Sequence, residues 1–139
     1  MPYDFELIQE LCQESGLCSR IRSSDRLEVE LGEGVVLLFQ NAEREEDCAV
    51  GFEGMPWLVH EPFTFADSGR YIEMDYLDMV SGLKNGLVLV CERWRGANLL
   101  ERWLIHCEYN DEFKYMEEGE EIRVRRAVTV LGPQCTAIS

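Results

Sequence analysis

The sequence predicts an α+β fold, in which residues 1–139 form one domain with a mostly antiparallel sheet of about six strands and two helices. Three observations lead to this expectation. Two segments repeat apolar residues at helical spacing, several alternate apolar and charged residues as half-buried strands do, and turn residues separate these strands. With 139 residues, 46% of them hydrophobic, the chain can form one core but not two independent ones.

The first half of the chain predicts a helix followed by an antiparallel meander. Residues 4–15 carry an apolar helical stripe from Phe5 to Cys12, and Gly16 is a typical helix end. The segments that follow alternate apolar with charged residues, which is typical of strands with one solvated face. Strands are expected at residues 26–31, 35–40 and 48–52, and a polar loop at 41–47 joins the last two.

The second half predicts short strands, a second helix and a hairpin. The expected elements are strands at 57–59 and 63–65, a turn at 67–69, a helix at 73–84, hairpin strands at 87–95 and 99–110, and a strand at 121–131. The central turn residues of the hairpin are Gly96 and Ala97. In the simplest register Glu92 faces Glu101, and the repulsion between these like charges leaves a second register open, with a one-residue slip or bulge.

The charge of the chain is strongly negative and unevenly distributed. There are 27 Asp+Glu against 13 Lys+Arg, a net charge of −14, and residues 1–80 hold 18 of the acidic side chains but only 5 of the basic ones. Nucleic acid is not an expected partner, because phosphate binding needs clustered Lys and Arg. Such a surface can steer a basic protein partner, and it can also be a solvated face that only keeps the protein in solution. The candidate partner-binding residues are Glu28, Glu30, Glu33, Glu43, Glu45, Glu46 and Asp47, with Trp57 as an exposed aromatic anchor.

Few residues are candidates for chemistry. His60 and His106 are the only histidines of the sequence, and the predicted hairpin separates Cys91 from His106 by more than hydrogen-bond reach. Asp75 and Asp78 share a helical face, but acids on a helix surface are usually just solvated. We therefore expect no catalytic residue, no metal site and no cofactor.

The cysteines and the hydropathy pattern predict a compartment. None of the six cysteines has C-x-x-C spacing, which argues against a zinc or thioredoxin-type site. The first residues lack the basic and apolar regions of a signal peptide, and the longest apolar runs have five residues, too few to cross a bilayer. The expectation is a cytoplasmic protein with no membrane segment and six free thiols.

Part of the chain resembles a class of bacterial proteins. The stretches Glu92-Arg93-Trp94 and Glu101-Arg102-Trp103-Leu104-Ile105-His106, followed by the acidic residues 111–121, resemble small immunity proteins encoded beside polymorphic or contact-delivered toxins. Such proteins are acidic, cytoplasmic, single-domain α+β proteins with a Trp-rich hairpin and no catalytic motif. The resemblance implies an antitoxin that neutralises a cognate toxin in bacterial competition.

The expected function is therefore that of an immunity protein, which inhibits a basic toxin by protein–protein interaction through its acidic surface. Two alternatives from other classes stay open. One is a small enzyme with a Cys/His site in an aromatic pocket, and the other is an adaptor domain that forms a homodimer through a sheet edge. The concentrated negative charge favours the inhibitor, because an enzyme needs convergent residues rather than an extended field.

Overall fold

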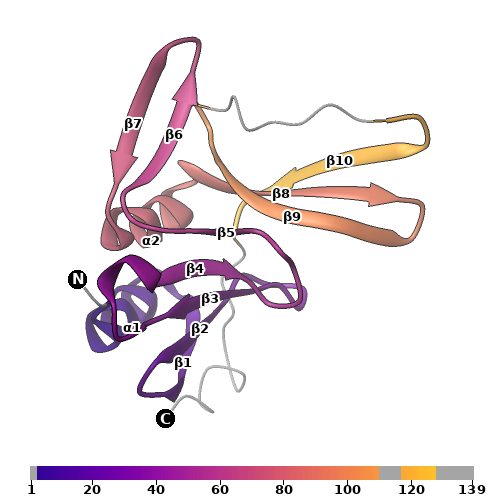
Figure 1. The fold of residues 1–139 in the computed structure, drawn as a ribbon. Coiled ribbons are helices and arrows are strands. Elements are labelled where there is room, and N and C mark those ends of the chain that lie inside the picture. Colours follow the sequence, from indigo (N-terminus) through magenta and orange to yellow (C-terminus); the bar gives the residue numbers. More distant parts are fainter. Residues whose placement is uncertain (1–2, 110–116, 128–139) are drawn as a thin grey trace.

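Figure 1 shows the fold in the computed structural model, which describes residues 3–109 and 117–127. Within these residues there are two α-helices and ten strands, and the strands form three antiparallel sheets. The predicted α+β class with two helices is confirmed. The ten strands exceed the expected six or so. Eight of them lie in the segments expected above, residues 18–23 and 70–74 are additional strands, and the ten divide among three sheets instead of one.

The first sheet and helix α1 (Phe5–Ser15) form the lower part of the molecule in Figure 1. The sheet has five strands in sequence order: β1 (Cys18–Ser23), β2 (Arg26–Glu30), β3 (Val36–Gln40), β4 (Ala49–Phe52) and β5 (Leu58–Val59). Because neighbouring strands are antiparallel, the β1–β2 turn and the β3–β4 loop lie at one end of the sheet. A hydrogen bond of 2.9 Å from Asn41 N–H to Asp25 O joins these two connections. The β2–β3 turn lies at the opposite end.

Local sequence explains the bounds of α1. The side chain of Asp4 accepts a hydrogen bond from the Leu7 N–H at 3.1 Å, which satisfies an orphan donor of the first turn. Gly16 ends the helix in the left-handed conformation, with φ of 75°, which glycine adopts without a steric penalty. Phe5, Ile8 and Cys12 are buried, as the apolar stripe predicts.

The middle of the chain forms a hairpin and the second helix. β6 (Phe63–Asp67) pairs with β7 (Arg70–Met74), and α2 (Tyr76–Asn85) follows directly. The expected helix began at Glu73, but Glu73 pairs with Thr64 in the hairpin, and the helix starts only after Asp75, whose carboxylate caps the Asp78 N–H at 2.8 Å.

The third sheet contains the predicted C-terminal hairpin and one more strand. Its order is β10 (Glu120–Arg125), β8 (Val88–Arg95), β9 (Asn98–His106). Arg95 pairs with Asn98 around the predicted turn, and a bulge between Arg93 and Trp94 then shifts the register by one residue. Glu92 consequently faces Arg102 instead of Glu101, so the like-charge conflict is resolved by the bulge.

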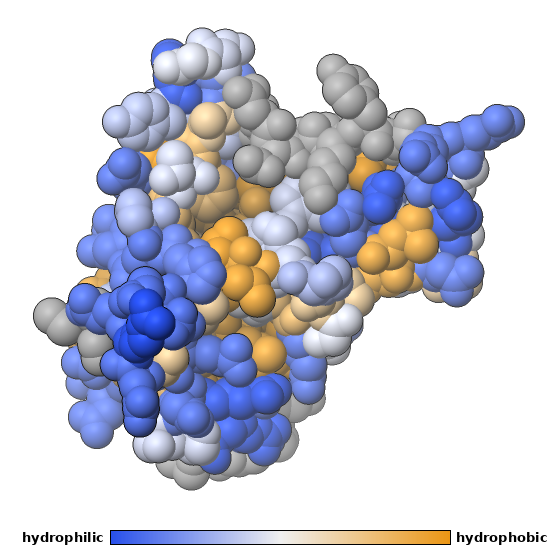
Figure 2. Space-filling view, in the orientation of Figure 1, coloured by the Kyte–Doolittle hydropathy of each residue, from blue (hydrophilic) through white to orange (hydrophobic). Residues whose placement is uncertain are grey.

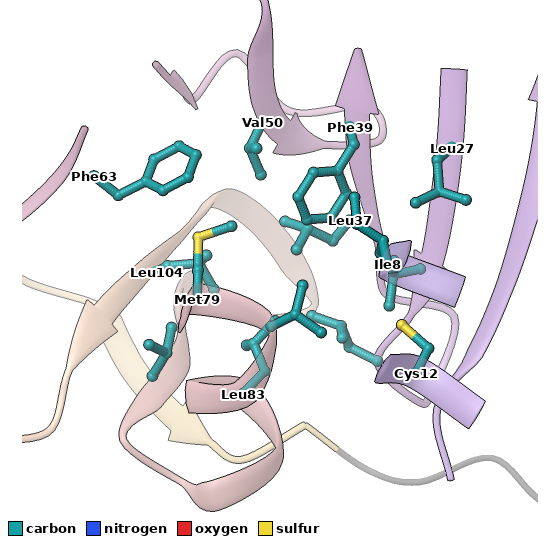
Figure 3. Close-up of a cluster of buried hydrophobic side chains, with 14 of the residues drawn as sticks. Ile8, Cys12, Leu27, Leu37, Phe39, Val50, Phe63, Met79, Leu83 and Leu104 are labelled. Atoms are coloured by element: carbon teal, nitrogen blue, oxygen red, sulfur yellow. The ribbon is translucent and has the colours of Figure 1, made fainter. Parts of the chain in front are cut away.

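One continuous core connects these parts. Figure 3 shows Ile8 and Cys12 of α1 against Leu27, Leu37 and Phe39 of the first sheet, with Met79 and Leu83 of α2 beside them. Phe63 of β6, Val88 and Val90 of β8 and Leu104 of β9 belong to the same cluster. A smaller cluster on the other face of the third sheet contains Cys91, Trp103 and Ile105.

The close approach of β4 and β5 yields a first prediction. A Cβ at Gly51 would lie 2.8 Å from the backbone oxygen of Trp57 and 3.3 Å from Cβ of Leu58. Because a backbone oxygen cannot rotate away, we expect Gly51→Ala to lower the free energy of unfolding by about 1–3 kcal/mol. Urea denaturation measures this change, and an unchanged midpoint would contradict the pairing of these strands.

Candidate functional site

The β3–β4 loop forms an acidic corner, defined here as residues 43–48, which includes the 3₁₀ turn η1 (Glu45–Asp47). Arg44 hydrogen-bonds to Glu46 and lies 3.9 Å from Asp47. The pKa of Glu46 is lowered, mainly by a hydrogen bond from the backbone of Glu46 itself and secondly by the hydrogen bond from Arg44. Residues 43–47 of the corner are exposed, and hydrophilic side chains cover this region at the lower left of Figure 2, while Cys48 is buried.

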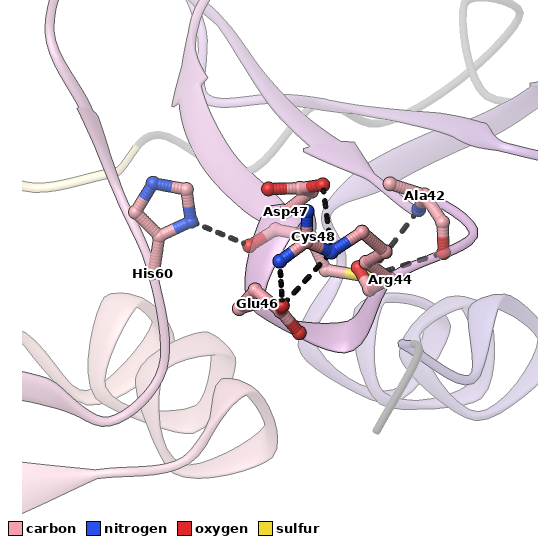
Figure 4. Close-up of polar contacts among 6 residues, drawn as sticks. All are labelled: Ala42, Arg44, Glu46, Asp47, Cys48 and His60. Carbon is pink, nitrogen blue, oxygen red and sulfur yellow. Dashed lines mark hydrogen bonds and ion pairs between the residues drawn. The ribbon is translucent and has the colours of Figure 1, made fainter.

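Cys48 anchors the corner to the sheet. Its Sγ accepts a hydrogen bond from the Ala42 N–H at 3.3 Å, and the thiol also lies 3.8 Å from the Ala42 carbonyl oxygen. His60 contacts the other side of this residue, since its Nδ1 is 2.9 Å from the Cys48 carbonyl oxygen (Figure 4). A carbonyl oxygen only accepts, so Nδ1 carries a hydrogen, and in the tautomer with one ring hydrogen Nε2 is an acceptor.

Tyr3 docks against the same end of the sheet. Its backbone exchanges hydrogen bonds with the Asn41 side chain, at 2.6 Å from Tyr3 N to Oδ1 and 3.0 Å from Nδ2 to Tyr3 O. Its ring packs edge-on against Phe39, with centroids 5.5 Å apart, and lies 5.1 Å from the Tyr76 ring. The residue is 4% exposed, and its hydroxyl is buried with no hydrogen-bond partner. The pKa of Tyr3 is raised, mainly by burial of the hydroxyl and less by the negative charges of Glu61 and Cys48.

Two adjoining hollows lie beside the corner, and together they form what we call the acidic cleft. The first, of about 310 Å³, is lined by Tyr3, Glu45, Glu46, Cys48, His60 and Glu61. The second, of about 430 Å³, is lined by Glu61, Pro62, Glu73, Met74 and Asp75. Glu61 separates them and is held in place, because its carboxylate accepts a hydrogen bond of 3.0 Å from the Tyr76 N–H. Among these lining residues there are five carboxylates and neither a lysine nor an arginine.

The structure distributes the predicted partner-binding residues over separate places. Glu43, Glu45, Glu46 and Asp47 lie together in the acidic corner. Glu28 and Glu30 lie on the outer face of the first sheet, where Glu28 pairs with Arg22 at 2.9 Å and Arg26 at 3.5 Å. Glu33 is in the turn at the opposite end, 3.7 Å from Arg125.

Trp57 is half-buried, although the sequence predicts an exposed anchor. Its ring lies 5.6 Å from the Phe52 ring and packs against both hydrophobic clusters. It also lines an apolar hollow of about 120 Å³, together with Val59, Phe63, Thr64, Phe65, Met79 and Leu104. Trp57 therefore lies at the junction of the sheets and outside the acidic cleft.

Sequence reasoning missed most of the cleft. Three distant segments of the chain contribute the other lining residues of the cleft, and only folding brings these segments to the corner. The residues are Tyr3, His60, Glu61, Glu73 and Asp75. One signal was available, because Glu61 stands between a histidine and a proline in an irregular segment, where side chains are not committed to a sheet.

The Cys and His side chains considered for an enzymatic site do not meet. In the β8–β9 hairpin, Cys91 lies opposite Trp103, and Val88 lies opposite His106. The side chains of Cys91 and His106 therefore lie on opposite faces of the third sheet. His106 is buried and its Nδ1 accepts a hydrogen bond of 3.0 Å from the Glu108 N–H. Burial lowers the pKa of His106, and Glu108 opposes this shift. The thiol of Cys48 faces its own loop, while His60 contacts only the backbone of that residue.

The thiols differ from expectation at one position. Cys12, Cys48, Cys91 and Cys107 form no disulfide, but Cys18 is disulfide-bonded, so the prediction of six free thiols is wrong. The cytoplasmic location stays a prediction. Burial raises the pKa of Cys12 to about 12, which makes its thiol unreactive in the folded chain.

Neither a metal centre nor a membrane helix emerges from residues 3–109 and 117–127. No three His, Cys, Asp or Glu side chains in these ranges are grouped so that they could hold a metal ion. In the same ranges, neither helix has the length and apolar character needed to cross a bilayer.

Comparison with known proteins adds no identification. No protein-family model, no curated protein and no solved structure matches the chain. Functional inference therefore depends on the residues of the cleft and the corner themselves.

Proposed function

We propose that this chain is an inhibitory binding protein of the immunity type, which neutralises a basic toxin through the acidic cleft and the acidic corner. The observation that carries the proposal is the lining of the cleft, where five carboxylates adjoin with no lysine or arginine among them. A basic protein surface is the chemical complement of such a lining.

The rigidity of this region supports a binding role. The corner is fixed by hydrogen bonds from Ala42 to Cys48 and between His60 and the Cys48 carbonyl, and Glu61 is held by the backbone of α2. Carboxylates that are already in place lose little conformational entropy when a partner docks. Loops at the end of a sheet can also bind without disturbing the core below them.

The net charge of −14 supports rapid capture of a basic partner. An extended field of one sign raises association rates by about 10- to 1000-fold, and salt weakens this effect. Fast capture suits an inhibitor, which must occupy the toxin before it acts. The proposed mechanism is occlusion: the acidic surface covers the cationic residues with which the toxin would hold its own substrate.

A pair of charge reversals tests the proposal. We expect the double variant Glu45→Lys/Glu46→Lys to keep its fold, since exposed substitutions usually change stability by about 0.5 kcal/mol or less. Association with a purified basic partner should become about tenfold slower at low salt. The difference should shrink as added salt shortens the Debye length below about 8 Å. Stopped-flow or surface-plasmon kinetics measure both effects.

The matched control places the same charge change elsewhere. Glu10 and Glu14 are exposed on α1, so Glu10→Lys/Glu14→Lys changes the net charge equally without touching the corner. An equal slowing in both double variants would show that only the total charge matters, and unchanged kinetics in the corner variant would refute the proposed surface. Co-expression tests inhibition directly: the wild-type chain should restore growth to cells that produce the toxin, and the corner variant should restore it less.

A further inference from the structure

The hollow between Tyr3, His60 and Glu61 contains an unusual group, the Tyr3 hydroxyl. Tyr3 is only 4% exposed, and its hydroxyl is buried and makes no hydrogen bond. Buried polar atoms without partners are rare in folded proteins and call for an explanation. Tyr3 lines this hollow together with Cys48, His60 and Glu61.

The other polar groups of this hollow are mainly acceptors. Because His60 donates from Nδ1 to the Cys48 carbonyl, its Nε2 is an acceptor in the tautomer that carries one ring hydrogen. Glu61 accepts one hydrogen bond from the Tyr76 N–H, and a carboxylate has room for several more. Glu45 and Glu46 add two further carboxylates to the lining, of which Glu46 already accepts a hydrogen bond from Arg44. A ligand that fits must therefore be positively charged and must carry several N–H donors.

We infer that this hollow receives the guanidinium group of an arginine side chain carried by the basic partner, an inference that rests on the proposed function. A guanidinium presents five N–H donors in a planar fork and stays charged at all relevant pH values. It can donate to the Tyr3 hydroxyl and to carboxylates at the same time, which a point-like ammonium ion does less well. A metal ion is a poorer candidate, since no metal-holding group occurs in the described residues.

An NMR titration with small probes tests the inference without the partner. The probes are N-acetyl-arginine amide, the neutral isostere N-acetyl-citrulline amide, and N-acetyl-lysine amide. We expect the arginine probe to shift the ring signals of His60 and Tyr3 in a saturable way, the lysine probe to bind more weakly, and the citrulline probe to leave these signals in place. Equal shifts with citrulline, or tighter binding of lysine, would overturn the inference.

Tyr3→Phe isolates the hydroxyl. The variant removes only an unpaired buried polar atom, so its thermal midpoint should not fall, while its affinity for the arginine probe should fall about tenfold. The matched control is Tyr71→Phe, because Tyr71 is 64% exposed and does not line the cleft. Unchanged affinity in Tyr3→Phe would overturn the inference.

The two proposals fail in different experiments. If the corner reversal slows the partner but the arginine probe does not bind, the proposed function stands and the arginine site is wrong. If the probe binds but the corner reversal leaves partner kinetics unchanged, the arginine site stands and the proposed surface for the partner is wrong.

Discussion

Replacing Glu92 with alanine is expected to lower the free energy of unfolding by about 3–5 kcal/mol, because it leaves a buried arginine without its counter-ion. Arg102 Nε donates to Glu92 Oε2 at 2.7 Å, and both side chains are almost fully buried. The Trp94 indole also donates to Glu92, at 3.3 Å, and the Arg102 guanidinium lies 5.8 Å from the centre of the Phe52 ring. The change thus removes one acceptor shared by two donors. Chemical denaturation of the purified variant measures the loss.

Two comparison variants show whether burial causes this effect. Glu121 pairs with Arg123 at 2.6 Å but is 61% exposed, so Glu121→Ala should cost no more than about 1 kcal/mol. The double change Glu92→Leu/Arg102→Met replaces the ion pair by apolar side chains of similar size and should be much milder than Glu92→Ala alone. A loss in Glu121→Ala as large as that in Glu92→Ala would contradict this account.

The same pair shows how far local sequence reasoning extends. The turn at Gly96–Ala97 was predictable from the sequence, and the Glu92–Glu101 conflict pointed to a bulge as one of the solutions. The position of the bulge was not predictable, because it depends on two contacts of Arg102, an ion pair with Glu92 and a contact with the Phe52 ring of another sheet. Local rules therefore identified the hairpin, and tertiary contacts selected its register.

Strands β1 and β7 were not predicted from the sequence, and the reasons can be identified. Residues 18–23 alternate poorly in hydropathy, since the polar Ser19 faces inward on the same side of the strand as Ile21. Arg20 pairs across the strands with Glu28. Residues 70–74 include Met74, which fits an apolar helical stripe with the residues of α2 that follow it. Only the pairing with β6 shows that this segment is extended. Period counting cannot place the boundary between a strand and a helix when the last apolar residue of the strand is in phase with the apolar stripe of the helix.

The candidate site was predictable in part. A run of like charges between two strands indicated the acidic corner, because such residues cannot be buried and must project from the sheet. The cleft beside it depends on Tyr3 and Glu61, which approach the corner through Asn41 and Tyr76. These contacts join residues 38 and 15 positions apart in the chain, beyond the reach of any local pattern.

Phe39→Ala is the second large effect that we expect, with a loss of about 3–5 kcal/mol in the free energy of unfolding. Phe39 is fully buried on β3, pairs with Leu27 and Val50, and supports the Tyr3 ring edge-on at 5.5 Å. Truncation leaves a cavity between the first sheet and the N-terminal segment. Tyr3 loses the surface that holds it in the cleft, so affinity for an arginine probe should also fall, although no polar group of the cleft has changed.

An exposed aromatic residue provides the control for this truncation. Tyr71 is 64% exposed on β7, so Tyr71→Ala removes a comparable ring and should change stability by about 0.5 kcal/mol or less. Phe39→Leu should lie between the two, because leucine refills part of the cavity. Urea denaturation of the three variants gives their order directly. If Phe39→Ala lost stability but kept full affinity for the probe, Tyr3 would be held by Asn41 alone, and the link between the core and the cleft through the Phe39 ring would be refuted.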